Sequence, residues 1–252
     1  MVRIAISGIC GKMGRTLLSC ISERTDCEVC CGIDIGEAKG CPVPVYKTPA
    51  EMQEKPDVII DYSHPSTLRG LLDYALETGT PVVLATTGYS EEQLAEIRQA
   101  SEKAAFFSSF NMSIGIQLLI ALSKKAAAVL GNRFDIEIIE KHHNQKIDAP
   151  SGTALMLANA LCEASDPQKH PVYDRHSVRK KREITEIGIH SVRGGTIVGE
   201  HEVLFAGPDE CISLTHTASS KRVFAEGSVN AAIFLVGRAP GLYDMTDLLN
   251  EA

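Results

Sequence analysis

The sequence has no long uninterrupted apolar run and no excess of positive charge, and each absence narrows what the protein can do. Its longest apolar stretches fall short of about 18 residues, the length that a membrane-spanning helix needs. Residues 1–6 run directly into a strand-like pattern, without the segments typical of a secretory signal. With a formal net charge of −7, a general nucleic-acid partner is disfavoured. We therefore expect a cytoplasmic protein that binds neither a membrane nor a nucleic acid.

The chain also lacks the features of a disulfide-rich or metal-binding protein. It has eight cysteines in 252 residues and no export signal, which argues against a disulfide framework. Cys27 and Cys30 have the spacing of half a zinc site, but no second pair or histidine follows at a suitable distance. On a strand their side chains also point to opposite faces. We expect reduced structural thiols and no metal.

What is present is the composition of a soluble globular protein, with 44% hydrophobic and 23% charged residues. The first part of the chain alternates strand-like with helix-like segments, which predicts an α/β fold with a parallel sheet of the Rossmann type. The predicted strands are residues 2–6, 28–33, 58–60, 81–85 and 105–108, and the predicted helices are residues 15–23, 66–77 and 91–103.

A glycine-rich turn between the first strand and the first helix indicates dinucleotide binding. Gly8, Gly11 and Gly14 form a Gly-x-x-Gly-x-x-Gly variant of the dinucleotide fingerprint. Asp34 follows 20 residues after Gly14, at the end of the second strand, where an acid accepts hydrogen bonds from the adenosine ribose. Ligands of such sheets gather at the carboxyl ends of the strands. One candidate cofactor cleft therefore includes the glycine loop, Asp34, and residues 62–63, 85–87 and 109–112.

After an amphipathic helix at residues 114–130, the alternation of strands and helices gives way to segments that are mostly strand-like. Strand-like runs at residues 134–139, 184–192, 196–205 and 211–217 predict a second, α+β domain on an open antiparallel or mixed sheet. Residues 164–177 are expected to form a long loop, and a helix at 223–236 is expected to pack back on the first domain. We therefore predict a dinucleotide-binding domain (1–113), a substrate-binding and oligomerisation domain (114–222) and a C-terminal return (223–252).

Residues 140–153 carry the most distinctive chemistry, and we expect them in a loop between a strand and a helix. His142, His143 and Lys146 place three nitrogen bases close together, and histidine is the side chain that exchanges protons near neutral pH. Ser151 is a good N-cap, so the backbone N–H groups of Gly152 and Thr153 lie at the positive end of a helix dipole. This corner is suited to a carboxylate or phosphate. The basic run at residues 179–182 is either a solvated loop or a source of positive potential for an anionic substrate.

At these residues the sequence resembles the 4-hydroxy-tetrahydrodipicolinate reductases, also called dihydrodipicolinate reductases. The resemblance covers essentially the whole chain, and the run from His142 to Thr153 is its most specific part. The matching motifs are GICGKMG at 8–14, TTG at 86–88, NMSIG at 111–115, the run 140–154, GEH at 199–201 and GLYDM at 241–245.

The resemblance implies hydride transfer from NADH or NADPH to an unsaturated cyclic dicarboxylate, giving tetrahydrodipicolinate, in lysine and diaminopimelate biosynthesis. It places the catalytic proton donor and acceptor on His142 and a proton-donating lysine on Lys146, with His143, Gly152 and Thr153 binding substrate. Such enzymes form homotetramers, and closure of the two domains around the substrate is expected. The implied cofactor-binding residues are Gly8, Ile9, Cys10, Gly11, Lys12, Met13, Asp34, Ala85, Thr86, Thr87, Ser109, Phe110, Asn111 and Met112.

Three residues depart from the family pattern. Ala85 replaces a usual glycine, Met112 replaces a frequent phenylalanine, and Ile35 follows Asp34 where some members have an arginine for the 2′-phosphate of NADPH. Asp34 without that arginine favours NADH, while Lys12 or Lys39 could hold NADPH, so use of both cofactors stays open.

Three other functions compete with this interpretation. Another two-domain nicotinamide dehydrogenase accounts for the first domain equally well but leaves the run at 142–153 unexplained. A zinc hydrolase built on His142, His143 and Asp148 is disfavoured because adjacent residues of an extended segment point apart. A non-catalytic dinucleotide sensor is the third, and it would bind NADH without oxidising it.

Overall fold

The computed structural model describes residues 1–165 and 169–251, and the chain divides into two compact units. The first unit is Met1–Ile114 together with Lys221–Ala252, and the second is Gly115–Ser220. The chain thus leaves the first unit once and returns to it for its last segment.

The first unit is built on a parallel sheet of seven strands. Its strands are β1 (Val2–Ser7), β2 (Cys27–Ile33), β3 (Val45–Tyr46), β4 (Val58–Asp61), β5 (Val82–Leu84), β6 (Ala105–Ser108) and β12 (Gly241–Tyr243). Their order in the sheet is β12-β6-β5-β4-β1-β2-β3, and neighbouring strands pair in parallel. The predicted Rossmann-type sheet is confirmed, while β3 and β12 were not predicted.

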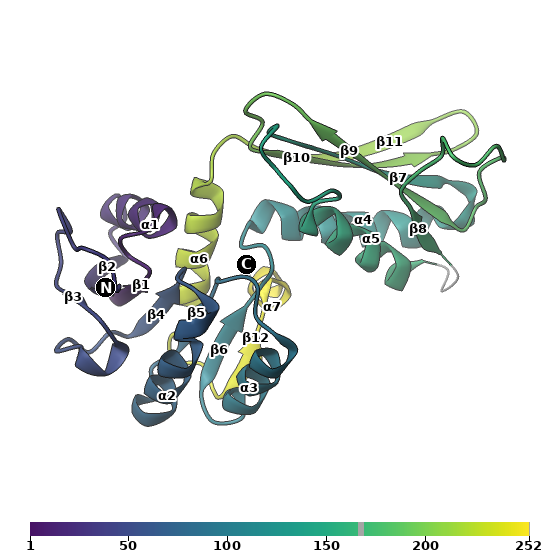
Figure 1. Ribbon diagram of the computed structural model, residues 1–252. Helices are drawn as coiled ribbons and strands as arrows, with labels where there is room; N and C mark the ends of the chain where they lie inside the picture. The colour runs from purple at the N-terminus through teal and green to yellow at the C-terminus, as the bar shows by residue number, and fades with distance from the viewer. Residues whose placement is uncertain (166–168, 252) are drawn as a thin grey trace. The chain divides into compact units, whose positions relative to one another are not determined.

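Helices cover this sheet and are drawn in Figure 1. They are α1 (Lys12–Ser22), α2 (Leu68–Thr78), α3 (Glu91–Ser101), α6 (Arg222–Leu235) and α7 (Met245–Asn250), with 3₁₀ turns at Pro49–Glu51 and Pro65–Thr67. The helix α1 begins three residues before its predicted start, because Gly11 is its N-cap and the glycine loop turns directly into the helix. Ser90 and Gln93 form a capping box that begins α3.

The connections of β1 create the expected ligand site. From β1 the chain passes to β2 on one side, and β4 pairs with the other side of β1. The loops after β1, β2 and β4 therefore leave the same edge of the sheet at the point where the strand order reverses, which is where sheets of this kind bind ligands. The apolar residues Ile4, Ile6 and Ile60 lie beneath this edge in a fully buried core.

The second unit is a mixed sheet of five strands with two helices along one face, as Figure 1 shows. The strands are β7 (Asp135–His142), β8 (His170–Val172), β9 (Glu186–Arg193), β10 (Gly199–Ala206) and β11 (Cys211–Ala218), in the order β11-β10-β7-β9-β8. The helices are α4 (Ile114–Leu130), continued by a 3₁₀ turn at Gly131–Arg133, and α5 (Gly152–Ala164). The prediction of a mixed sheet is confirmed: β7 and β8 pair with β9 in parallel, and β10 pairs with β7 and β11 antiparallel.

Strand β7 is central in this sheet and is longer than the sequence indicated. Its predicted end at residue 139 was wrong, because β10 continues to pair with it through Lys141 and β9 through His142. Its residues alternate between buried and half-buried from Asp135 to His142, so Glu140 and His142 lie on the face that packs against the helices. This places the first part of the distinctive run on a strand and not in a loop.

Two other expectations need correction. The predicted long loop at 164–177 contains the short strand β8, and its residues 166–168 lie outside the described residues. By length and composition, Ile114–Arg133 is apolar enough to cross a membrane, with a mean hydropathy of 1.5, which the count of uninterrupted apolar residues did not indicate. One such helix is weak evidence for a membrane span, because core helices of soluble proteins pass the same test. Ile116 and Leu119 of this helix pack in the core of the second unit.

Candidate active site

The glycine loop after β1 forms one wall of a pocket of about 550 Å³ in the first unit. Gly8 has a φ of +80°, and a Cβ there would lie 2.4 Å from the carbonyl oxygen of Tyr62. At Gly14 a Cβ would lie 2.3 Å from the carbonyl oxygen of Gly8. These glycines are therefore required by the tight turn and by the close contact between the loop and α1. Gly8, Cys10, Gly11 and Asp34 are the predicted cofactor residues that line this pocket.

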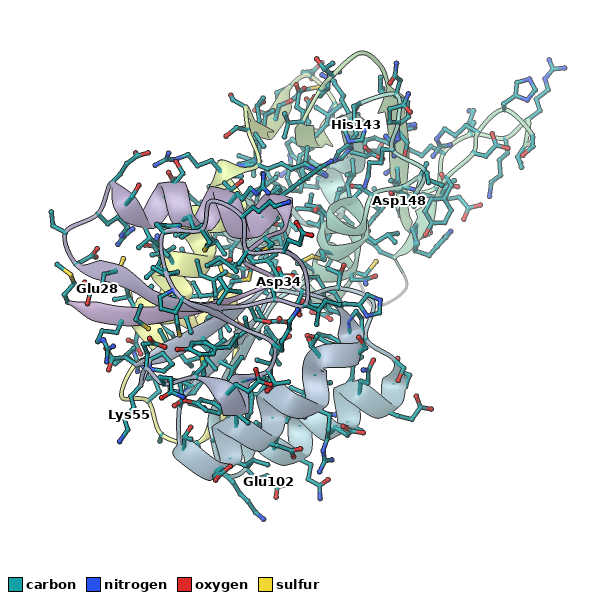
Figure 2. The ribbon with its side chains drawn as sticks, turned by 60° about the vertical axis from the view of Figure 1, so that its left-hand side comes forward. Glu28, Asp34, Lys55, Glu102, His143 and Asp148 are labelled. Carbon is teal, nitrogen blue, oxygen red and sulfur yellow. The ribbon has the colours of Figure 1, made fainter. Side chains whose placement is uncertain are left out.

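Asp34 holds the glycine loop against the end of β2 (Figure 2). Its Oδ2 accepts a hydrogen bond from the backbone N–H of Cys10 at 2.9 Å, and its Oδ1 accepts one from Gly36 at 2.8 Å. Each carboxylate oxygen keeps a lone pair for a further donor such as a ribose hydroxyl. The pocket lining also contains Lys47, whose Nζ donates to the carbonyl oxygen of Ile35 at 3.0 Å.

A buried carboxylate organises the loops after β4 and β5. Asp61 is fully buried and accepts hydrogen bonds from the hydroxyls of Ser63 at 2.5 Å and Thr86 at 2.6 Å. The Thr86 hydroxyl in turn accepts a hydrogen bond from the backbone N–H of Ser63 at 2.9 Å. Thr86 is therefore joined to Ser63, which lines the pocket beside the glycine loop. Ala85 is buried behind it and Thr87 is exposed.

The remaining predicted cofactor residues differ widely in exposure. Lys12 is exposed and Met13 half-buried on the first turn of α1, whereas the side chain of Ile9 lies in the core. The side chain of Met112 is also in the core, and Phe110 is 81% exposed. Ser109 and Asn111 brace this loop: the Ser109 hydroxyl donates to the Asn111 carbonyl at 2.9 Å, and the Asn111 side chain accepts from Ser113 N–H at 2.8 Å. Ile9 and Met112 can therefore meet a cofactor only through their backbone atoms.

In the second unit, His142 is the last residue of β7 and is paired with a buried carboxylate. Its Nδ1 lies 2.5 Å from Oε2 of Glu140, which is fully buried. Burial raises the pKa of Glu140, but hydrogen bonds from Arg193 and its neighbours outweigh this and lower it to about 2. Burial lowers the pKa of His142, and the charge of Glu140 opposes that effect.

Arg193 and Ser151 complete the partners of Glu140. The guanidinium of Arg193 donates to both carboxylate oxygens at 2.8 Å, and the backbone N–H of Ser151 donates to Oε1 at 3.1 Å. Arg193 also donates to the carbonyl oxygen of Asp148 at 2.6 Å. The end of β7, the end of β9 and the start of α5 are thus joined through one carboxylate.

His201 on β10 packs edge-on against His142, with ring centroids 5.2 Å apart and planes at 73°. Its Nε2 lies 3.0 Å from the hydroxyl of Ser151, which also caps α5 by accepting from Ala154 N–H at 3.2 Å. Burial, and then the neighbouring His142, lower the pKa of His201 to about 4. His201 is therefore an uncharged neighbour of His142 at neutral pH.

The loop between β7 and α5 carries the other predicted residues, with His143 and Asp148 labelled in Figure 2. Nζ of Lys146 forms an ion pair with Asp148 at 2.9 Å, and the Lys146 side chain is 21% exposed. Nδ1 of His143 is buried and has no hydrogen-bond partner among the described residues. Gly152 begins α5 and is exposed, with nothing within 4 Å of where its Cβ would be, and Thr153 follows half-buried.

The basic run at residues 179–182 is largely used within the fold. Arg182 donates to Asp135 at 2.7 Å and to Glu137 at 2.8 Å, and so ties its segment to β7. Lys180 pairs with Glu183 at 2.9 Å. Arg182 is only 16% exposed, so at this residue the segment is not the solvated loop of the first interpretation.

Sequence reasoning did not assign roles to Glu140, Arg193, His201 or Asp61. Glu140 had a signal, since it precedes His142 by two residues and residues two apart share one face of a strand. Arg193 lies 53 residues from Glu140 and reaches it only because β9 pairs with β7. No pattern in a single sequence reports that pairing.

Comparisons with known proteins agree across the whole chain. Residues 2–112 match the family model for the N-terminus of dihydrodipicolinate reductase, and residues 115–249 match the model for its C-terminus. The 4-hydroxy-tetrahydrodipicolinate reductase of Caldanaerobacter subterraneus is 47% identical over 251 residues, covering 100% of this chain and 99% of the relative. That of Exiguobacterium sibiricum is 54% identical over 209 residues, covering 83% of each chain.

A similar solved structure is the dipicolinate-bound dihydrodipicolinate reductase from Paenisporosarcina sp. TG-14. It is 29% identical, with a TM-score of 0.81 and 97% of both chains covered. A myo-inositol dehydrogenase from Corynebacterium glutamicum, 16% identical with a TM-score of 0.59, shares the fold alone. The chain therefore belongs to the dihydrodipicolinate reductase family, the NAD(P)H-dependent 4-hydroxy-tetrahydrodipicolinate reductases of lysine and diaminopimelate biosynthesis.

Proposed function

We propose that this chain reduces its cyclic dicarboxylate substrate with His142 and Lys146 as the catalytic residues. Bound NADH or NADPH supplies a hydride, with its two electrons, to the conjugated ring of the substrate. Charge then builds up on that ring, so a nearby cation or acid lowers the barrier and a proton completes the reduction. His142 supplies this proton from Nε2, and Lys146, the other acid of the site, provides the nearby positive charge that lowers the barrier.

The observation that carries the proposal is that the two ring nitrogens of His142 have different surroundings. Its Nδ1 is engaged by Glu140 at 2.5 Å, while its Nε2 lies over Gly199, where a Cβ would come within 3.2 Å. Because Gly199 has no side chain, no Cβ from β10 crowds Nε2, and we assign the substrate to this nitrogen. A histidine with one anchored nitrogen and one open nitrogen is suited to proton transfer.

The start of α5 supports binding of a carboxylate. The backbone N–H of Ser151 donates to Glu140, which fixes the position of the helix N-terminus close to His142. Gly152 is exposed there, and its missing side chain leaves the positive end of the helix open to an anion. We assign Gly152 and Thr153 to one substrate carboxylate and His143 to the binding of the same substrate. The similar Paenisporosarcina structure, which holds dipicolinate, supports a cyclic dicarboxylate as the ligand.

We assign the pocket of the first unit to a nicotinamide dinucleotide. A Cβ at Gly8 would meet backbone atoms of Tyr62, so only glycine lets the loop pack this closely against the end of β4. Asp34 is anchored by two backbone N–H groups and retains lone pairs for ribose hydroxyls. We assign pyrophosphate to residues 8–13, ribose to Asp34, and the nicotinamide side to residues 85–87 and 109–112.

We infer that the chain uses NADH well and accepts NADPH. Asp34 favours an unmodified ribose, while Lys47 in the pocket lining provides an ammonium near it. Lys39 is paired with Glu37 at 2.8 Å, with both side chains exposed, which makes it a weaker partner for a 2′-phosphate. We also infer a cytoplasmic homotetramer, with the second unit providing the subunit contacts, and light scattering of the pure protein measures that mass.

The test is oxidation of NADH, and separately of NADPH, in the presence of precursor made freshly by the preceding synthase. Oxidation that depends on the precursor, at a higher rate with NADH, is the expected result. In Asp34→Ala the dissociation constant for NADH should rise far more than the rate of the chemical step falls. If NADH binds by titration but no precursor-dependent oxidation occurs, the substrate assignment is wrong and a sensor or another dehydrogenase is favoured.

A further inference from the structure

Glu140 is a buried charged residue to which the reaction described above gives no role. None of its side chain is exposed, and its carboxylate faces His142 from two residues away on the same face of β7. With a pKa of about 2 it is ionised at neutral pH, so it can only accept hydrogen bonds. Nδ1 of His142, 2.5 Å away, must therefore carry the proton that they share.

Several donors fix the orientation of this carboxylate, and the side chain of Ser191 is one of those that lower its pKa. Oε1 accepts from Nη2 of Arg193 at 2.8 Å and from the backbone N–H of Ser151 at 3.1 Å. Oε2 accepts from Nη1 of Arg193 at 2.8 Å and from Nδ1 of His142. A bidentate arginine leaves the carboxylate no freedom to rotate away from the histidine. Arg193 additionally holds the loop between β7 and α5 by its bond to the carbonyl oxygen of Asp148 at 2.6 Å.

We propose, on the basis of the function proposed above, that Glu140 is a positioning residue for the proton transfer. It keeps one proton on Nδ1 of His142, so that Nε2 is always the nitrogen that gives and regains the transferred proton. Arg193 holds Glu140 in this orientation and couples it to the loop that carries Lys146.

The proposal accounts for the proton balance at the ring. Protonated His142 carries a proton on each nitrogen, and it donates the one on Nε2 while the proton on Nδ1 remains with Glu140. The neutral ring then has its lone pair on Nε2, where it faces Gly199 and can be reprotonated. Without an anionic partner, the neutral ring could place its proton on Nε2, and that tautomer has its lone pair on the buried side.

The charges around His142 also set the pH range of the reaction. The groups that face it are Glu140, Lys146, Arg193 and His201. Burial lowers the pKa of His142, Glu140 raises it, and Lys146 and Arg193 lower it. Removing the charge of Glu140 should therefore lower the pKa of His142 further. Protonated His142 is the donor, so activity falls as the pH rises through its pKa. With a lower pKa, this fall should begin at a lower pH.

Glu140→Gln is the primary test, because it preserves shape and removes charge. A glutamine replaces one of the two carboxylate oxygens by an NH₂ group. The donors on that side of the side chain then face N–H groups instead of an acceptor. Arg193 and the Ser151 backbone cannot give up a proton, whereas His142 can shift its proton from Nδ1 to Nε2. We expect turnover to fall on the order of 100-fold, cofactor KM to change little, and the alkaline limb of kcat to move to lower pH. Nitrogen-15 NMR should show the His142 proton on Nδ1 in the parent and on Nε2 in the variant.

Glu137→Gln is the matched control. Glu137 lies on the other face of β7 and also has an arginine and a histidine as partners, Arg182 at 2.8 Å and His190 at 2.7 Å. This variant should keep parental turnover and the parental pH profile. Glu140→Asp is the second variant: it retains the charge next to Arg193 but withdraws it from His142, and it should lower turnover with the protein folded.

The outcomes separate the two proposals. If the parent fails to reduce the precursor, the proposed function is wrong, and the NMR measurement on the parent still decides whether Glu140 sets the tautomer. If the parent is active and both Glu140 variants keep its turnover and its alkaline limb, Glu140 is not a positioning residue. A parental His142 that carries its proton on Nε2 would overturn the proposal in either case.

Discussion

Strand β7 carries a glutamate–histidine–arginine cluster on each of its two faces, and the two clusters differ in burial and geometry. The inner cluster faces the helices, and the outer cluster faces away from them. Their members are Glu140, His142 and Arg193 inside, and Glu137, His190 and Arg182 outside. The inner glutamate side chain is 0% exposed and the inner histidine 11%, against 18% and 45% for the outer pair.

The difference shows why residue types alone do not identify a catalytic site. The outer histidine uses Nε2 to contact its glutamate at 2.7 Å, whereas the inner histidine uses Nδ1 at 2.5 Å and turns Nε2 toward Gly199, which has no side chain. In the outer cluster the histidine is the exposed partner, at 45%, and an ion pair with an exposed partner is worth little because water competes for it. Burial strengthens the inner pair, and the choice of nitrogen makes it usable for proton transfer.

Replacing the histidine of each cluster should give the largest difference in turnover between the two clusters. His142→Gln removes the proposed proton donor, so turnover should fall 100-fold or more while NADH affinity stays nearly unchanged. His190→Gln removes the corresponding side chain of the outer cluster and should leave turnover at the parental level. Steady-state kinetics of both variants, with NADH titration, measure the effect. Equal turnover in the two variants would remove His142 from the mechanism.

The inner glutamate should also dominate the response of stability to acid. The pKa of Glu140 is lowered from 4.5 to about 2 in the folded protein, which corresponds to about 3 kcal/mol of stability. Because the folded value is below the unfolded one, this contribution is fully present above pH 4.5 and is lost as the pH falls toward 2. In Glu140→Gln the free energy of unfolding should therefore decline less steeply over that range.

Chemical denaturation at several pH values between 5 and 2 provides the measurement. Glu137→Gln, measured in parallel, reports the same curve with only the outer cluster broken, and it should keep the parental dependence on pH that Glu140 provides. If Glu140→Gln and the parent decline with the same slope, the inner carboxylate is not held by its partners as the geometry indicates.

The sequence predicted the first unit better than the second for a physical reason. Its strands are buried on both faces, so β4 and β5 are continuous apolar runs, and each is bounded by turn-forming residues. The glycine loop and Asp34 are close in sequence to the strands that hold them. Short edge strands such as β3 and β12 have two or three residues and leave no period to detect.

In the second unit the site depends on pairings between distant strands. His142 and Lys146 could be chosen from local spacing, but the end of β7 could not, since its last residues are held in the strand by β9 and β10. The role of Arg193 follows from the same pairing. Arg182 lies in the segment before β9, and it meets Glu137 through contacts that local sequence spacing does not predict.

The smallest effect on turnover is expected from adding a methyl group next to Nε2 of the inner histidine. A Cβ at position 199 would come within 3.2 Å of Nε2 of His142, which is closer than ordinary van der Waals contact. Gly199→Ala should therefore displace the ring or crowd the substrate and lower turnover by about 10-fold, with a smaller change in stability. Gly194→Ala, where a Cβ would meet nothing within 4 Å, is the control and should retain parental turnover. Dipicolinate binding by both variants distinguishes crowding of the substrate from displacement of the ring. Parental turnover in Gly199→Ala would mean that the working side of His142 is not Nε2, and the distinction between the inner and outer clusters would then rest on burial alone.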